Sequence, residues 1–187
     1  EEDLVDELVE LDSSDVILAS GGGSGVTATS LISLSSRCSN AGATFVLLGR
    51  TELIPETADW IDWDEEKLEQ RNHSLRDTML EDYVMDSRPQ KKVSIVEWEN
   101  AWQPYLRSLD INATIDAIES CGNTAIYRSC DVLELDSVIS VGKEIGKKYG
   151  PITIIVHGAG VEDSKLVGDK DLVTFERVLN IKTKGWI

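Results

Sequence analysis

The sequence predicts an α/β fold in which a doubly wound parallel sheet is covered by helices. Short, β-branched apolar runs alternate with helical patterns along much of the chain, and a glycine cluster joins the first run to the first helix. The runs are apolar throughout, which fits strands buried on both faces. At 187 residues the chain has room for one domain with a substantial core.

The first half opens in the order strand, helix, strand. Residues 15–20 (DVILAS) form the first predicted strand, and residues 44–48 (TFVLL) form the second. Between them, residues 27–38 carry apolar side chains at helical spacing. This is the unit from which parallel sheets are built.

The alternation resumes near residue 110. We expect helices over residues 110–120, 137–149 and 171–184, and strands over residues 124–131 and 152–157. Asp110 is the predicted N-cap of the first of these helices, and Gly122 closes it. Gly150 follows the end of the second helix, whose last turn carries lysines.

Residues 53–109 do not fit this alternation and are predicted to form a helical insertion. They contain four of the five tryptophans: Trp60, Trp63, Trp98 and Trp102. Trp98 and Trp102 are four residues apart, so one helix presents both rings on the same face. We expect the rings to pack the insertion onto the domain, and a partner-binding surface is the alternative.

The charge of the chain argues against a nucleic-acid partner. The net charge is −16, whereas phosphate binding needs a basic face. Acidic residues gather in residues 1–14, a lead-in or linker before the domain at 15–187, and again in residues 52–86. Solvated helix faces and a linker explain both stretches, and a docking surface for another domain is the alternative.

The composition also indicates the cellular compartment and whether a metal site is expected. No apolar run approaches the length of a membrane span, and the start carries no signal-peptide pattern. The three cysteines, Cys38, Cys121 and Cys130, lack metal or redox spacing. We therefore expect a cytoplasmic protein with no membrane partner and no metal site.

The glycine cluster is a candidate nucleotide site. Gly21, Gly22, Gly23, Ser24, Gly25 and Val26 lie between the first strand and the first helix. A pyrophosphate binds bare backbone amides at a helix N-terminus, and glycine lets the chain approach it closely. The position predicts nucleotide binding, and a simple tight turn is the alternative.

The end of the second strand indicates which nucleotide is bound. An acidic residue at this place would accept hydrogen bonds from the adenosine ribose and select NAD. Here the strand ends in Arg50 and Thr51. A guanidinium suits the 2′-phosphate of NADP, and the threonine hydroxyl adds a donor to the same phosphate. We therefore predict NADPH as cofactor, with a surface arginine as the alternative.

Four stretches together resemble a known family. They are SGGGSGVTA (20–28), LLGRT (47–51), CDV (130–132) and HGAGVEDSKL (157–166). In this order they are similar to the ketoreductase domains of modular polyketide synthases and polyunsaturated-fatty-acid synthases, which belong to the short-chain dehydrogenase/reductase superfamily. The resemblance implies a Rossmann-type sheet. Thr27 departs from most of the superfamily, which has a third glycine at that place, and it makes the helix entry bulkier.

The resemblance also implies roles for individual residues. Asp131 and Val132 would contact adenine, and the HAAG-type turn would lie against the nicotinamide ribose through His157, Gly158, Ala159 and Gly160. Lys182 stands three residues before Gly185, where the ketoreductase branch carries a lysine. Its implied role is to position the catalytic tyrosine and the cofactor ribose and to support proton delivery. A solvated lysine is the alternative.

The implied reaction is reduction of a β-keto group by NADPH. The substrate would be an acyl chain on an acyl carrier protein, within a multidomain synthase whose other domains are neighbours. The family's catalytic serine and tyrosine would follow residue 187, so we expect the chain to be the cofactor-binding portion, inactive alone, through truncation or completion by another polypeptide. The alternatives are a non-catalytic structural or NADPH-binding module and a stand-alone dehydrogenase.

Overall fold

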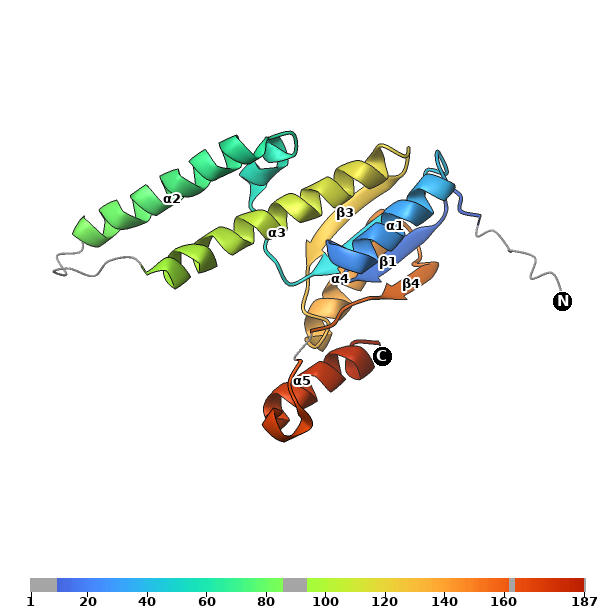
Figure 1. The fold of residues 1–187 in the computed structure, drawn as a ribbon. Helices are drawn as coiled ribbons and strands as arrows, with labels where there is room; N and C mark the ends of the chain where they lie inside the picture. The colour runs from blue at the N-terminus through green and yellow to red at the C-terminus, as the bar shows by residue number, and fades with distance from the viewer. Residues whose placement is uncertain (1–9, 86–93, 162–163, 187) are drawn as a thin grey trace, which may run out of the picture. The chain divides into compact units, whose positions relative to one another are not determined.

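The computed structural model describes residues 10–85, 94–161 and 164–186. The chain divides into two compact units, and most of their helices and strands are labelled in Figure 1. The first unit combines the chain up to Arg50 with the chain from Thr114 onward, and the second unit is Thr51–Ala113. The predicted insertion, residues 53–109, lies within the second unit.

The first unit is built on a parallel sheet. Within the described residues it has four strands: β1 (Val16–Ser20), β2 (Thr44–Gly49), β3 (Thr124–Ser129) and β4 (Ile154–His157). Their order in the sheet is β3-β2-β1-β4, so the chain builds outward on one side of β1 and then returns to its other side. All carboxyl ends lie at one edge, and a crevice forms where the strand order reverses. The predicted parallel sheet is confirmed.

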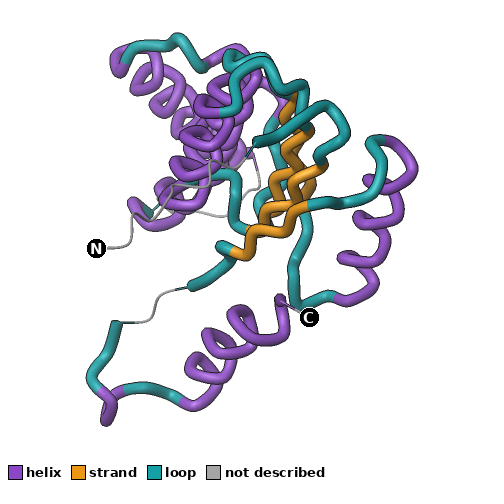
Figure 2. The backbone as a smooth tube through the Cα atoms, turned by 90° about the vertical axis from the view of Figure 1, so that its right-hand side faces the viewer, coloured by secondary structure: helices purple, strands orange, loops and turns teal. Residues whose placement is uncertain are grey.

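Helices cover both faces of this sheet, as Figure 2 shows for the orange strands. Val16, Val46 and Leu48 form a core cluster with α4 (Leu135–Lys148), whose Ile145 is fully buried. The residues that alternate with them on β1 and β2 face the other way and are equally buried, namely Ile17, Ala19, Phe45 and Leu47. On that face lies α1 (Gly25–Arg37), whose Leu31 is 2% exposed.

Buried polar groups tie α1 to the end of α3 (Ile95–Glu119) in the first unit. The Ser35 hydroxyl donates to the Ile118 carbonyl at 3.3 Å, and the Asn123 amide donates to Ser35 Oγ at 2.9 Å. These bonds satisfy groups that would otherwise be buried without partners.

The start of α3 corrects one sequence prediction. We expected a helix from residue 110 with Asp110 as N-cap, but the helix begins at Ile95 and Asp110 lies inside it. The cap is a capping box: the Glu97 amide donates to Ser94 Oγ at 3.1 Å, and the Ser94 amide donates to the Glu97 carboxylate at 3.0 Å. Gly122 follows the helix with a φ of +80°, which agrees with its predicted closing role.

The second unit contains α2 (Glu65–Met85), the 3₁₀ turn η1 (Pro55–Trp60) and α3 as far as Ala113. Trp60 stacks on Trp63 at 5.0 Å, on Tyr105 at 5.6 Å and on Trp102 at 6.1 Å between ring centroids. Trp98 instead stacks on His73 of α2. The rings therefore pack against one another inside this unit.

The remaining elements lie after β4. They are η2 (Val167–Asp169), α5 (Leu172–Thr183) and η3 (Lys184–Trp186). Asp171 caps α5 by accepting a hydrogen bond from the Thr174 amide at 2.8 Å. No helix among the described residues has the length and apolarity to cross a membrane.

Candidate cofactor-binding site

A pocket of about 360 Å³ opens at the carboxyl end of the sheet in the first unit. It lies at the strand-order reversal, where β2, β1 and β4 are neighbours. Many of the predicted cofactor-binding residues line it: Gly21, Ser24, Val26, Arg50, Asp131, Val132, Gly158, Ala159 and Gly160. The fold thus brings together four segments that are far apart in the sequence.

The glycine loop lies close to the turn that follows β4, residues 158–160, which is called the β4 turn below. Gly21 has a φ of +70°, and a Cβ there would lie 2.8 Å from the carbonyl carbon and oxygen of Gly158 and from the Ala159 nitrogen. The Gly21 amide also donates to the Leu48 carbonyl at 2.8 Å. Glycine is therefore required at position 21 both by backbone conformation and by space.

The loop leads into a helix end suited to an anion. Ser24 is the N-cap of α1, and in the described structure its side chain makes no capping hydrogen bond. The first-turn amides of α1 are therefore not satisfied by this cap, and Ser24, Val26 and Thr27 at the start of the helix line the pocket. A helix N-terminus of this kind can accept an anion.

The other residues predicted from the loop have different places. Gly22 and Gly23 are buried, and the Gly23 carbonyl accepts a hydrogen bond from the Thr114 hydroxyl at 3.1 Å. Gly25 is exposed and begins α1. Their backbones shape the loop, while Gly21, Ser24 and Val26 form the pocket wall.

Arg50 and Asp131 follow the ends of the paired strands β2 and β3, where Gly49 is in register with Ser129. Arg50 is exposed and lines the pocket, so its guanidinium is accessible to a ligand phosphate. The Asp131 carboxylate accepts a hydrogen bond from the Leu133 amide at 3.0 Å, which holds the turn into α4. Thr51 belongs to the second unit, and its predicted contact with the 2′-phosphate stays a prediction.

His157 is held by protein groups on both ring nitrogens. Its Nε2 lies 3.1 Å from the Ile181 carbonyl, and its Nδ1 lies 2.7 Å from Ser20 Oγ. Since a carbonyl only accepts, Nε2 carries the proton, and in the neutral ring Nδ1 accepts from the Ser20 hydroxyl. Ser20 Oγ in turn accepts from the Ala159 amide at 3.3 Å. His157 therefore links β1, the β4 turn and α5.

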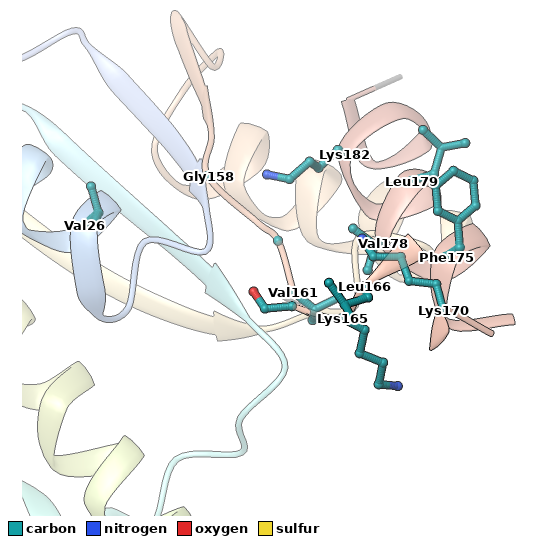
Figure 3. A pocket seen from close by; sticks show the side chains of 12 residues that line it. Val26, Gly158, Val161, Lys165, Leu166, Lys170, Phe175, Val178, Leu179 and Lys182 are labelled. Carbon is teal, nitrogen blue, oxygen red and sulfur yellow. The ribbon is translucent and has the colours of Figure 1, made fainter. Parts of the chain in front are cut away.

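A larger pocket, of about 1230 Å³, extends from the same turn toward α5. Val26, Gly158 and Gly160 line both pockets. Figure 3 shows the Lys182 side chain reaching from α5 toward the turn that holds Gly158. The Lys182 Nζ lies 3.2 Å from the position that a Cβ on Gly160 would take. An amine is thus placed beside the turn.

The walls of this larger pocket are mixed in character. Leu166, Phe175, Val178 and Leu179 are apolar, and Lys165 and Lys170 add two amines. Lys165 lies 3.7 Å from the Asp171 carboxylate. The pocket therefore has an apolar wall beside lysine amines, one of which lies near the Asp171 carboxylate.

Some residues of the smaller pocket were not predicted as site residues. They are Thr27, Leu48, Gly49, Cys130, Val161 and Ile181. Leu48, Gly49 and Cys130 stand beside predicted residues at strand ends, a signal that was available in the sequence. Ile181 was not accessible to sequence reasoning, because only the packing of α5 near the turn brings it there. Within residues 10–85, 94–161 and 164–186, no cluster of His, Cys, Asp and Glu is suited to hold a metal ion.

Known proteins share both the sequence pattern and the fold. The short chain dehydrogenase family model matches residues 105–187. One component protein of a polyunsaturated fatty acid synthase from Thraustochytrium sp. is 25% identical over 180 residues, which are 94% of this chain and 6% of that protein. The chain therefore spans a small part of this relative.

Solved structures give the same fold. An N-terminal ketoreductase from the macrolactin assembly line has a TM-score of 0.60 and 18% identity, covering 97% of this chain and 26% of that one. A carveol dehydrogenase from Mycobacterium avium, solved in complex with NAD, has a TM-score of 0.54 and 15% identity, covering 92% and 46%. At these identities the likeness concerns the fold.

The parallel sheet, with its pocket at the strand-order reversal and a glycine loop entering α1, has the architecture of a Rossmann-type fold. Residues 105–187 match the short chain dehydrogenase family model, and the fold of the chain is similar to those of the ketoreductase and dehydrogenase structures above.

Proposed function

We propose that this chain is the cofactor-binding portion of an NADPH-dependent ketoreductase domain. The domain would reduce the β-keto group of an acyl chain carried by an acyl carrier protein, within a multidomain polyketide or polyunsaturated-fatty-acid synthase. One observation carries the proposal: a single pocket is lined by the start of α1, by Arg50 and by the β4 turn. The relatedness to a component of such a synthase supports the multidomain setting.

The residues present fit a dinucleotide phosphate. The start of α1, with the close approach at Gly21, would hold the pyrophosphate. Arg50 would pair with the 2′-phosphate as a charge-assisted hydrogen-bond donor, and Asp131 and Val132 would border the adenine. The β4 turn, fixed by Ser20 and His157, would support the nicotinamide ribose. When bound, NADPH supplies the hydride for the reduction.

The larger pocket supports an acyl substrate on the same side as the β4 turn. Phe175, Val178 and Leu179 offer an apolar wall for an alkyl chain. Lys182 lies where the two pockets meet, beside Gly160. Its amine would hold the cofactor ribose and the proton-delivering hydroxyl in place.

A cofactor titration tests the proposal. NADPH and NADH are added to the full chain, and binding is followed by nicotinamide fluorescence. We expect NADPH to bind more tightly, and Arg50→Gln to weaken NADPH binding about 10–100-fold while leaving NADH binding nearly unchanged, because only NADPH carries the 2′-phosphate. Arg37→Gln, at the opposite end of α1, is the matched control and should change neither affinity.

Two results would overturn the proposed function. One is a folded chain that binds neither nucleotide. The other is an equal loss of NADH and NADPH affinity in Arg50→Gln, which would mean that Arg50 supports the fold and not the 2′-phosphate.

A further inference from the structure

The start of α1 and the β4 turn meet at a second point, between Thr27 and Gly158. A Cβ on Gly158 would lie 2.7 Å from Thr27 Cγ2 and 2.9 Å from Thr27 Cβ, and would overlap Thr27 Oγ1. Gly158 is not among the residues with positive φ, so its backbone conformation does not require glycine. The requirement for glycine at position 158 comes from the Thr27 side chain.

Neither partner can move away easily. The Thr27 Cβ is part of the overlap, and its position does not depend on the side-chain rotamer. On the other side, the Gly158 amide donates to the Ser20 carbonyl at 2.9 Å, and the Ala159 amide donates to Ser20 Oγ at 3.3 Å. Gly21 packs against the same peptide from the glycine loop. The turn is therefore fixed at its strand end.

The two residues are complementary in size. Position 27 carries a branched side chain and position 158 carries none. The space that a methyl group on residue 158 would need is filled by the Thr27 side chain. Both residues line the smaller pocket, and Gly158 also lines the larger one.

We propose that Thr27 is a positioning residue of the cofactor pocket and forms a size-matched pair with Gly158. Thr27 fills the space between the first turn of α1 and the β4 turn, and so sets the separation of the two walls that would hold the pyrophosphate and the nicotinamide ribose. The effect on cofactor binding rests on the proposed function, whereas the packing of the pair does not.

A double-mutant cycle in the full chain tests the pair. Gly158→Ala should lower the melting temperature by about 3–10 °C, because it overpacks a fixed contact. It should also weaken NADPH binding at least about tenfold, since the pocket walls are displaced. Adding Thr27→Gly should restore most of both losses, while adding Thr27→Ala should restore less, because alanine removes Oγ1 and Cγ2 but keeps the Cβ that would lie 2.9 Å from a Cβ on residue 158.

The matched control for an added methyl group is Gly146→Ala in α4. Nothing lies within 4 Å of a Cβ at Gly146, so this variant should be as stable as the wild type or slightly more stable, and should keep its NADPH affinity.

The outcomes separate the pair from the proposed function. Additive losses in the double variant, or a Gly158→Ala variant that behaves as wild type, would overturn the pair. Recovered melting temperature without recovered NADPH affinity would overturn the positioning role. A wild-type chain that binds no NADPH would overturn the proposed function, and the melting temperatures would still decide whether the pair exists.

Discussion

Lys182 and His157 both lie near the β4 turn, yet their side chains have different surroundings. Both ring nitrogens of His157 are hydrogen-bonded to protein groups, Ser20 and Ile181. The Lys182 amine instead lies at the wall of the larger pocket, beside Gly160. At the scale of single residues, His157 holds the turn, and the Lys182 amine lies at the pocket wall.

Replacing Lys182 should therefore affect turnover more than folding. Within the proposed ketoreductase function, we expect Lys182→Met in the protein that contains this chain to lower kcat for ketone reduction about 100-fold, because the proton-delivering hydroxyl would lose its positioning amine. The melting temperature should stay near that of the wild type, since Lys182 is exposed. Steady-state kinetics and a pH–rate profile measure the effect.

Lys184→Met is the matched control, because Lys184 is an exposed lysine two residues further along the chain. It should leave kcat unchanged. An equal decrease of kcat in Lys182→Met and Lys184→Met would contradict a specific role for Lys182.

Among the elements, α5 depends on a charged cap. The Thr174 amide donates to the Asp171 carboxylate at 2.8 Å and holds the pKa of that carboxyl below its ordinary value, with Lys165 adding a smaller effect. A depressed pKa means that the carboxylate stabilises the folded state above its unfolded pKa. This contribution is lost as the pH falls through the folded pKa.

The cap predicts a pH-dependent difference between variants. Asp171→Ala should destabilise α5 at pH 7, whereas Asp171→Asn, which still accepts the amide hydrogen bond, should cost less. The difference in the stability of α5 between wild type and Asp171→Ala should shrink as the pH falls from about 5 toward about 3, because the wild-type carboxyl becomes protonated. Amide hydrogen exchange of α5, corrected for intrinsic rates, measures this. A gap that does not change with pH would contradict it.

In the second unit, a stack of aromatic rings joins η1 to α3. Trp60 is 4% exposed and contacts Trp63, Trp102 and Tyr105, with the Arg71 guanidinium 5.6 Å from its ring centroid. Such a ring contributes through buried area and through stacking. Trp63 lies at the edge of the stack and is only partly buried.

Removal of the central ring, Trp60, should lower the free energy of unfolding much more than removal of the outer ring, Trp63. We expect Trp60→Ala to lower the free energy of unfolding by about 3–5 kcal/mol, the range for a large buried aromatic residue. Trp63→Ala should cost less than half as much. Chemical denaturation followed by near-ultraviolet circular dichroism compares them, and equal costs would show that the stack is not centred on Trp60.

The helix boundaries show where sequence reasoning is strong and where it is incomplete. The start and end of α1, α4 and α5 lie close to their predicted places, because apolar spacing and caps are local signals. The start of α3 was missed although its capping box, Ser94 to Glu97, is visible in the sequence. Asp110 is a residue type favoured at N-caps, which led to the wrong start, but it lies inside this helix.

At the largest scale, the strand order of the first unit determines where its pocket lies. Parallel strands place all carboxyl ends at one edge, and the reversal of strand order between β1 and β4 opens the crevice there. Residues that follow strands in the sequence, such as Arg50, Asp131 and Gly158, are therefore brought to one pocket. This is why candidate site residues could be predicted at strand ends before the structure was known.

The sequence by itself determined the alternation of elements, the parallel sheet and the glycine loop at the start of α1, because these depend on patterns within contiguous residues. Only the tertiary structure decided how the loop and the β4 turn fit together. It showed that Gly21, and not the buried Gly22, forms the pocket wall, that His157 is held by Ser20 and Ile181, and that Thr27 excludes a side chain at Gly158. Such contacts change when two elements shift by a fraction of an ångström, and no periodicity along the chain encodes positions so finely.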